Sequence, residues 1–143
     1  MKQYTLTLIF HKDLREVLMC WHEKQQAYNF IGGSVEPGEN SFEASYRELF
    51  EETGISANDA VLVMVRDETV RGNRYVYQDD WHMYVTCAVV DKSVHTVEEK
   101  NHLEWMDIGD TRIDKQTTGF GNCRVFLNEA LMILQELRNI GVV

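Results

Sequence analysis

The segment GSVEPGENSFEASYRELFEETGI, residues 33–55, constrains the fold more than any other part of the chain. Its second half predicts a helix over residues 41–53. Asn40 followed three residues later by Glu43 has the pattern of a capping box, which marks the start of a helix. Gly54 stands where a residue in the left-handed conformation ends a helix. The ends of this helix are therefore well specified by the sequence.

The two faces of the predicted helix differ in character. One face carries a stripe at helical spacing that is expected to pack on the core. This stripe consists of Phe42, Tyr46, Leu49, Phe50 and Thr53. The opposite face carries Glu48, Glu51 and Glu52, which lie close together at about 100° per residue. Like charges at this spacing, beside the negative end of the helix dipole, oppose helix formation.

Two interpretations of this acidic face remain open. It is either a solvated charged surface or a site for a hard divalent cation, which binds several converging carboxylate oxygens. The small side chain of Ala44 would leave room for a ligand beside the carboxylates. Arg47 is expected to pair with Glu43 and Glu51 and so to hold one carboxylate in place.

The rest of the chain alternates between strands and helices. Strands are predicted over residues 3–10, 16–21, 60–66, 74–78, 81–91 and 103–106. Loops are predicted over residues 30–40 and 110–121, and a second helix over 122–139. One helix between strands and another at the end suggest an α/β fold with helices on both faces of a mixed sheet.

Size and charge limit the classes of function. The 143 residues, of which 44% are hydrophobic, predict a single domain over residues 1–143. The net charge of −9 repels nucleic acids and anionic membranes, so neither is an expected partner. An anionic substrate would need a cation to be held here.

The chain is expected to be cytoplasmic. Its first ten residues alternate as a strand does and lack the pattern of a signal peptide. No stretch reaches the roughly 20 apolar residues that cross a bilayer. Cys20, Cys87 and Cys123 have no metal-binding spacing and are interpreted as reduced thiols in or near the core.

Residues 33–55 resemble the Nudix box, G-x5-E-x7-R-E-U-x-E-E-x-G-U, in which U is a bulky aliphatic residue. The matching residues are Gly33, Glu39, Arg47, Glu48, Leu49, Glu51, Glu52, Gly54 and Ile55. The resemblance implies the family's α/β/α sandwich around a mixed β-sheet. It also implies that Glu48, Glu51 and Glu52 bind Mg²⁺, which Mn²⁺ can replace, with help from a carbonyl at Gly32 or Gly33.

The resemblance assigns supporting roles as well. Glu39 would brace the loop, and Arg47 would orient a catalytic glutamate. The general base stays open between Glu48 and Glu52 in the box and an acidic residue of the segment 96–100, in which Glu98 is also a candidate metal ligand. For Glu98, a solvated charged turn is an equally good interpretation.

The segment Asn29-Phe30-Ile31-Gly32-Gly33 resembles the MutT-type members, which cleave nucleoside triphosphates. By this resemblance Asn29 would read the base, with Phe30, Gly33 and Ser34 lining the substrate site. Ser34 replaces a lysine common in these members, which puts the phosphate contact in doubt. Asn29 could equally serve only to tie the loop to neighbouring backbone.

Three functions are therefore compatible with the sequence. The expected one is Mg²⁺-dependent hydrolysis of a nucleoside triphosphate, possibly modified or oxidised, to the monophosphate and pyrophosphate. The alternatives are a pyrophosphatase of ADP-ribose or another nucleoside diphosphate derivative, and a catalytically silent module that senses nucleotides. Either a monomer or a homodimer is compatible with the sequence. Trp21, Trp81 and Trp105 could stack on a base, although aromatic residues in strands more often belong to the core.

Overall fold

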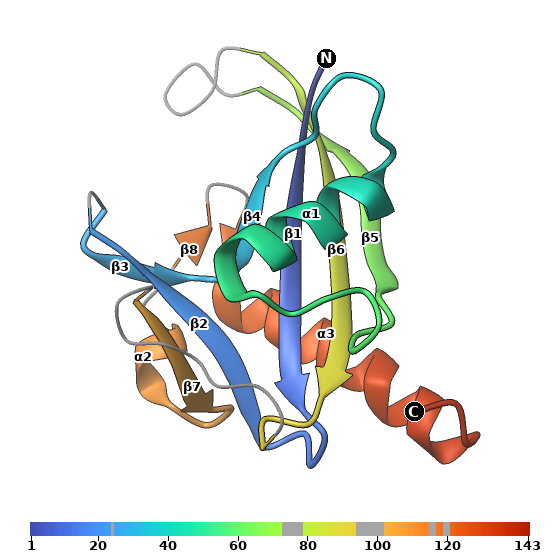
Figure 1. Cartoon of the computed structure of the whole chain (residues 1–143). Coiled ribbons are helices and arrows are strands. Elements are labelled where there is room, and N and C mark those ends of the chain that lie inside the picture. The colour runs from blue at the N-terminus through green and yellow to red at the C-terminus, as the bar shows by residue number, and fades with distance from the viewer. Residues whose placement is uncertain (24, 73–78, 94–101, 115–116, 119–120) are drawn as a thin grey trace.

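The computed structural model describes the whole chain except residues 24, 73–78, 94–101, 115–116 and 119–120 (Figure 1). A mixed β-sheet lies between two helices, with α1 (Ser41–Thr53) on one face and α3 (Cys123–Asn139) on the other. This arrangement confirms the predicted α/β fold. Within the described part of the chain, no helix is long and apolar enough to cross a membrane.

Among the described residues, seven strands form the main sheet, in the order β3-β2-β1-β6-β5, with β4 paired to β1 and β7 paired to β2. Their bounds are β1 (Lys2–His11), β2 (Glu16–His22), β3 (Ala27–Asn29), β4 (Ile31–Ser34), β5 (Val63–Val70), β6 (Trp81–Val90) and β7 (Leu103–Asp107). Of these neighbours, β1 and β6 run parallel. The predicted strand over residues 74–78 lies outside the described residues.

The sheet divides between β1 and β2, and beyond the division each of the two strands pairs with a different neighbour. The two strands pair at Phe10 and Val17, beside their connecting turn. Farther along, β1 pairs with β4 while β2 pairs with β3. Figure 1 shows β2, β3 and β7 splaying away from the rest of the sheet. Residues 30–40 were predicted to be a loop, but Ile31–Ser34 form β4 because the open edge of β1 takes up their backbone hydrogen bonds.

The segment before α3 is also more ordered than predicted. A short helix, α2 (Thr111–Asp114), and a small ladder of β8 (Thr117–Thr118) with β9 (Gly121–Asn122) lie within the predicted loop 110–121. Asn122 caps α3 by accepting a hydrogen bond from the backbone N–H of Arg124 at 2.8 Å. The predicted loop over residues 110–121 thus contains a short helix and a short two-stranded ladder.

Two apolar clusters hold the layers together. The larger lies between the sheet and α3, which contributes Phe126, Leu127, Ala130 and Leu134. The smaller lies between the sheet and α1 and contains Leu49 together with Ile55. Burial of these side chains is the main favourable contribution to the stability of the sandwich.

The ends of α1 agree with the prediction, but its buried face does not. Asn40 and Glu43 form the capping box, and Gly54 ends the helix with a φ of 77°. The residues buried against the sheet are Ala44, Ser45 and Leu49, whereas the side chains of Phe42 and Phe50 are 37% and 59% exposed. The predicted apolar stripe is therefore wrong in part, and Ala44 is fully buried instead of bordering an open space.

Candidate active site

The site forms where α1 crosses the two glycines of β4. A Cβ atom built on Gly33 would lie 2.2 Å from Oε1 of Glu48, so a side chain there would occupy the place of the carboxylate. A Cβ atom on Gly32 would lie 2.2 Å from the backbone oxygen of Thr5 on the paired strand. The close neighbour is the backbone of β1 at Gly32 and the Glu48 carboxylate of α1 at Gly33, so glycine leaves room for both contacts. The glutamates of α1 are thereby held against the backbone of β4.

Glu52 lies deepest in this site. Its Oε2 atom is buried and has no hydrogen-bond partner among the described residues. The backbone N–H of Gly32 donates to the carboxylate, but burial and the nearby charge of Glu48 outweigh this bond and raise the pKa of Glu52 to about 7. An unpartnered buried carboxylate oxygen costs free energy unless a ligand binds it.

Glu48 lies beside Glu52 and is held by Arg47. Its side chain is 14% exposed, and Arg47 Nη1 donates to its Oε1 at 2.9 Å. Burial raises the pKa of Glu48, and the Arg47 guanidinium opposes that rise. The carboxyl groups of Glu48 and Glu52 therefore share a partly buried space in which no positive charge fully offsets both negative charges.

Arg47 joins the helix to the loop that precedes it. Its Nε and Nη2 atoms donate to the two carboxylate oxygens of Glu39 at 2.8 and 2.9 Å, and Nη2 also donates to the carbonyl of Ser34 at 3.0 Å. Glu39 accepts a further bond from the backbone N–H of Glu36 at 2.8 Å, so it braces the loop as expected. The guanidinium holds the pKa of Glu39 below its usual range.

The pairing expected for Arg47 is correct for one glutamate only. Its Nη1 atom lies 3.3 Å from Oε2 of Glu51. Glu43 instead closes the capping box by accepting from the backbone N–H of Asn40 at 3.0 Å. The Glu43 side chain could either close the helix cap with Asn40 or pair with Arg47, and in the structure it closes the cap.

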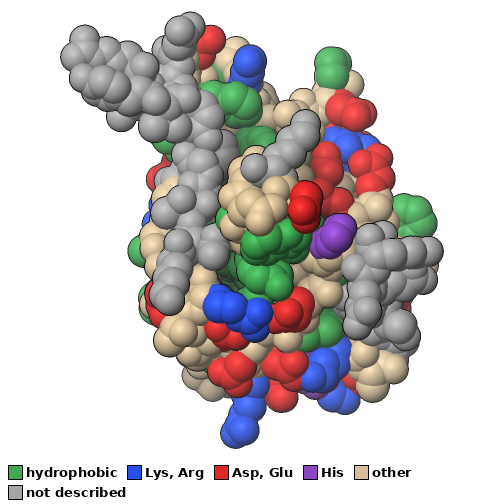
Figure 2. Space-filling model, turned by 90° about the vertical axis from the view of Figure 1, so that its left-hand side faces the viewer, with side chains coloured by type: hydrophobic (Ala, Val, Ile, Leu, Met, Phe, Trp, Pro, Cys, Tyr) green, Lys and Arg blue, Asp and Glu red, His purple; other side chains and the backbone are tan. Residues whose placement is uncertain are grey.

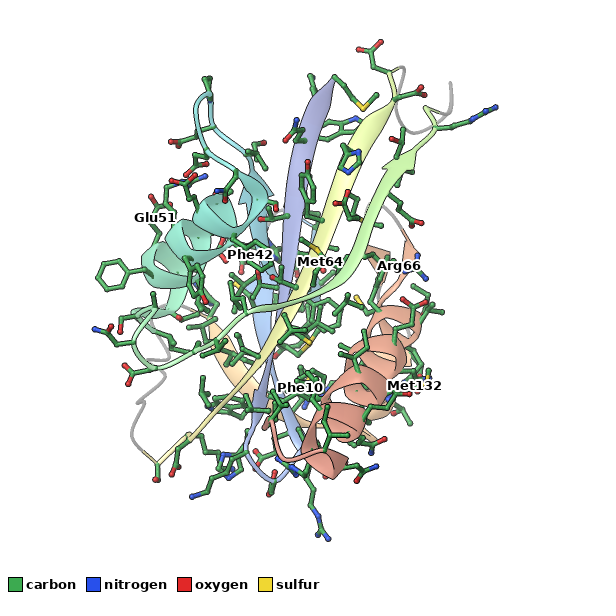
Figure 3. The ribbon with its side chains drawn as sticks, turned by 90° about the vertical axis from the view of Figure 1, so that its right-hand side faces the viewer. Phe10, Phe42, Glu51, Met64, Arg66 and Met132 are labelled. Atoms are coloured by element: carbon green, nitrogen blue, oxygen red, sulfur yellow. The ribbon has the colours of Figure 1, made fainter. Side chains whose placement is uncertain are left out.

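Glu51 is more exposed than Glu48, although both bond the same Nη1 atom of Arg47. Its side chain is 57% exposed and points away from the sheet on the outer side of α1 (Figure 3). Among the described residues, no three carboxylate, imidazole or thiol groups converge closely enough to hold a metal ion. The residues nevertheless fit a divalent cation, because the unpartnered oxygen of Glu52 is a hard ligand beside a second carboxylate.

The predicted substrate residues lie in different surroundings. Phe30 is 2% exposed and packs in the larger core cluster, so it presents no surface to a ligand. Asn29 Oδ1 accepts from the backbone N–H of Phe30 at 2.7 Å and from the thiol of Cys123 at 3.9 Å, which favours the bracing role. Ser34 is exposed at the end of β4, beside Gly33. Glu98 lies outside the described residues.

The structure also brings together three residues that no spacing in the sequence connects. Trp21, Tyr28 and Glu104 come from β2, β3 and β7 and line one groove of about 390 Å³. The aromatic character of Trp21 was the one available signal, since no sequence spacing connects these three positions. Their proximity depends on the pairing of β2 with both β3 and β7.

Comparison of the sequence with known protein families and proteins gives consistent matches. The NUDIX domain family matches residues 1–122. Human nucleoside diphosphate-linked moiety X motif 6 is 28% identical over 115 residues, which are 77% of this chain and 35% of that protein. A putative 8-oxo-dGTP diphosphatase of Bacillus subtilis is 26% identical over 102 residues, 71% of this chain and 64% of that protein. The chain therefore spans about a third of the human relative's length and just under two thirds of the bacterial one's.

Solved structures resemble the fold over nearly the whole chain. The dihydroneopterin triphosphate pyrophosphohydrolase of E. coli has a TM-score of 0.72 at 19% identity and covers 92% of this chain and 95% of its own. NrtR of Shewanella oneidensis, solved with a 27mer DNA, has a TM-score of 0.71 at 14% identity and covers 94% of this chain and 63% of its own. At these identities the likeness shows the fold alone.

Proposed function

The chain belongs to the NUDIX family, and from that premise we propose that it is a divalent-cation-dependent hydrolase of a phosphoanhydride bond in a nucleotide. The observation that carries the proposal is the Glu52 carboxyl, which is buried beside Glu48 with its Oε2 atom unpartnered. Such an arrangement opposes folding by itself and becomes favourable when a cation binds. The predicted requirement for Mg²⁺, with Mn²⁺ as a substitute, follows from these hard oxygen ligands.

The chain's own residues would divide the work as follows. Glu48 and Glu52 would hold the cation, and the exposed Glu51 would complete its ligands by turning toward them. When bound, Mg²⁺ supplies charge neutralisation at phosphate oxygens and lowers the pKa of bound water. Arg47 fixes the orientation of Glu48 and does not contact substrate. Of the two carboxylates, Glu52 would also be the better general base, because Glu48 already accepts a hydrogen bond from Arg47.

Within the family we propose a nucleoside triphosphate as the substrate, giving the monophosphate and pyrophosphate. The proposal draws support from a relative named as a putative 8-oxo-dGTP diphosphatase. The net charge of −9 suits a small nucleotide held through a cation better than a nucleic acid. Gly33 and Ser34 at the end of β4 would border its phosphates.

The test is a panel of nucleoside triphosphates, ADP-ribose and dinucleoside polyphosphates incubated with and without Mg²⁺, with the products identified by chromatography. We expect Mg²⁺-dependent release of a monophosphate and pyrophosphate from at least one triphosphate. Release of two monophosphates from ADP-ribose alone would move the assignment to the diphosphate derivatives. Binding of nucleotides without any turnover would refute a hydrolase.

A second readout does not depend on activity. Mg²⁺ alone should raise the melting temperature of the protein, because the cation binds the folded form. Glu52→Gln should remove most of this rise, whereas Glu68→Gln, which removes a glutamate from an arginine pair on β5, should leave it unchanged. An equal rise in all three proteins would place the cation elsewhere.

We further propose a reducing compartment for the protein. Cys20, Cys87 and Cys123, all among the described residues, form no disulfide, and burial raises the pKa of the Cys20 and Cys87 thiols to about 11 and about 12. Such thiols are unreactive and suit a core in which no cross-link is needed.

A further inference from the structure

A second unpartnered polar group lies on β2, apart from the glutamates of α1. Among the described residues, only two buried side-chain nitrogen or oxygen atoms lack a hydrogen-bond partner, namely Oε2 of Glu52 and Nε2 of His22. Such atoms are rare in folded proteins, because each one costs free energy unless a ligand or an ordered water bonds it. The proposed cation accounts for Glu52, and His22 needs a partner of its own.

His22 lies on the same side of the sheet as Glu52. Successive side chains of a strand point to opposite faces, so His22 shares a face of β2 with Cys20 and Leu18. Leu18 belongs to the smaller apolar cluster, which lies between the sheet and α1 and also contains Leu49, and Cys20 packs against that cluster. The imidazole of His22 is therefore on the α1 side of the sheet, as the glutamates of the site are.

The two unpartnered atoms lie on either side of the division of the sheet. The backbone N–H of Gly32 on β4 donates to the Glu52 carboxylate, and three residues earlier in the chain Asn29 on β3 pairs with Cys20. Two residues of strand, about 7 Å, separate Cys20 from His22. Figure 1 shows β2 and β3 splaying from the rest of the sheet here, and Figure 2, from that side of the molecule, shows acidic side chains toward α1. Glu52 thus lies beside β4 and His22 lies across the division on β2.

The imidazole of His22 suits an uncharged polar group. Burial lowers the pKa of His22 from its usual 6.5, so at pH 7 the ring is neutral, with one nitrogen that donates and one that accepts. A phosphate oxygen can only accept, and it is matched best by a fixed positive charge. A hydroxyl both donates and accepts, so it can pair with either tautomer of a neutral imidazole. In a nucleotide the sugar hydroxyls are the groups of this kind, and the sugar directly follows the phosphates.

We propose that Nε2 of His22 forms a hydrogen bond with a sugar hydroxyl of the nucleotide whose phosphates bind at Glu52. This inference rests on the proposed function, because it concerns the substrate of the same site. One ligand that crosses the division then satisfies both of the unpartnered atoms. A substrate that lacks the hydroxyl leaves a buried nitrogen unpaired, so the contact selects nucleotides by their sugar.

The experiment removes each partner of the proposed hydrogen bond in turn. The value of kcat/KM is measured with Mg²⁺ for a ribonucleoside triphosphate and for its 2′-deoxy and 3′-deoxy forms, with the base that the protein hydrolyses best. In the parent protein we expect one of the two deoxy forms to be poorer by at least about tenfold. In His22→Leu this ratio should fall to less than about threefold, because the variant has no group that the hydroxyl can bond.

Two further variants separate substrate binding from folding. His22→Gln keeps a donor and an acceptor and should restore part of the sugar preference. His82→Leu is the matched control, since it removes an imidazole of β6 that already bonds Asp67 and Thr69, and it should leave the preference unchanged. The melting temperature of His22→Leu should equal or exceed that of the parent, because the ligand-free protein loses an unpaired buried nitrogen. Loss of a histidine with a structural role would lower it instead.

A spectroscopic readout does not depend on hydrolysis. In nitrogen NMR spectra of the parent protein, the Nε2 resonance of His22 should shift when the nucleoside monophosphate is added, and should shift less with the deoxy form that is the poorer substrate. Equal losses of kcat/KM for all three sugars in His22→Leu, with no shift of this resonance, would overturn the inference and keep the proposed hydrolysis. A shift that depends on the sugar, in a protein without any turnover, would refute the hydrolase and keep the contact.

Discussion

At the residue scale, Glu52 links the stability of the protein to pH. The pKa of its carboxyl rises from 4.5 to about 7 on folding, so below pH 4.5 it is protonated in both the folded and the unfolded chain. As the pH rises from there, the unfolded chain ionises first, and the metal-free protein loses stability until the folded carboxyl has ionised near pH 7. The loss is on the order of 3 kcal/mol, since the pKa rises from 4.5 to about 7 and a rise of one corresponds to about 1.4 kcal/mol.

Glu52→Gln should therefore stabilise the metal-free protein at pH 8 and change it little at pH 5. The amide keeps an acceptor for the N–H of Gly32 and can donate toward Glu48. The measurement is urea unfolding at the two pH values in the presence of a chelator. The same variant should lose Mg²⁺-dependent activity. Equal effects at both pH values would mean that the carboxyl is already charged in the folded protein at pH 5.

Two neighbouring glycines should respond differently to alanine. In Gly33→Ala the new methyl group meets the mobile carboxylate of Glu48, which can swing aside, so the expected loss of stability is below about 1 kcal/mol while activity falls strongly. In Gly32→Ala it meets the backbone oxygen of Thr5, so the pairing of β4 with β1 must shift, at a cost of about 3 kcal/mol or more.

Melting temperature and kcat measured on both glycine variants test this contrast. We expect the Gly33→Ala protein to be stable but inactive and the Gly32→Ala protein to be unstable. A Gly33→Ala protein with normal turnover would show that Glu48 need not lie against β4 for the chemistry.

At the element scale, the unit formed by α1 and its preceding loop depends on Arg47. Lysine retains the charge but cannot make the paired bonds to Glu39 together with those to Ser34 and Glu48. Arg47→Lys should lower kcat by about 10- to 100-fold, as loss of a group that orients a ligand does.

Arg66→Lys provides the matched control for this effect. Arg66 bonds both oxygens of Glu129 and also Glu68, but it joins β5 to α3 on the other side of the molecule. Both lysine variants should be less stable than the parent, and only Arg47→Lys should lose turnover. A similar kcat for the two variants would assign Arg47 a purely structural role.

The same element shows what sequence can and cannot predict. The bounds of α1 follow from local signals, namely the capping box and Gly54, and they were predicted correctly. Its buried face depends on what lies opposite, and the glycines of β4 allow the Glu48 side to approach the sheet while Phe50 stays exposed. The pairing of β4 with β1 and the convergence of β2, β3 and β7 are contacts between distant segments. No local pattern contains such contacts, and for this reason β4 was predicted as a loop and the aromatic groove was missed.

At the scale of the whole molecule, the net charge of −9 opposes the approach of a nucleotide. The cation and the few local contacts must hold a ligand that the overall field repels. Salt weakens this repulsion, since the screening length falls from about 30 Å at 0.01 M to about 8 Å at 0.15 M ionic strength. We therefore expect kcat/KM to rise severalfold between these two conditions, provided that Mg²⁺ is kept saturating throughout.

The rise with salt should appear in kcat/KM and leave kcat nearly unchanged, because long-range charge affects the encounter more than a site sheltered from solvent. Initial rates at several concentrations of KCl, with the nucleotide varied at each, separate the two constants. Binding of an uncharged nucleoside serves as the control and should be insensitive to salt, since no net charge approaches the protein. If kcat/KM instead falls as salt is added, a local positive region must dominate the approach of substrate, and Arg47, which bonds Glu48, becomes the group to substitute.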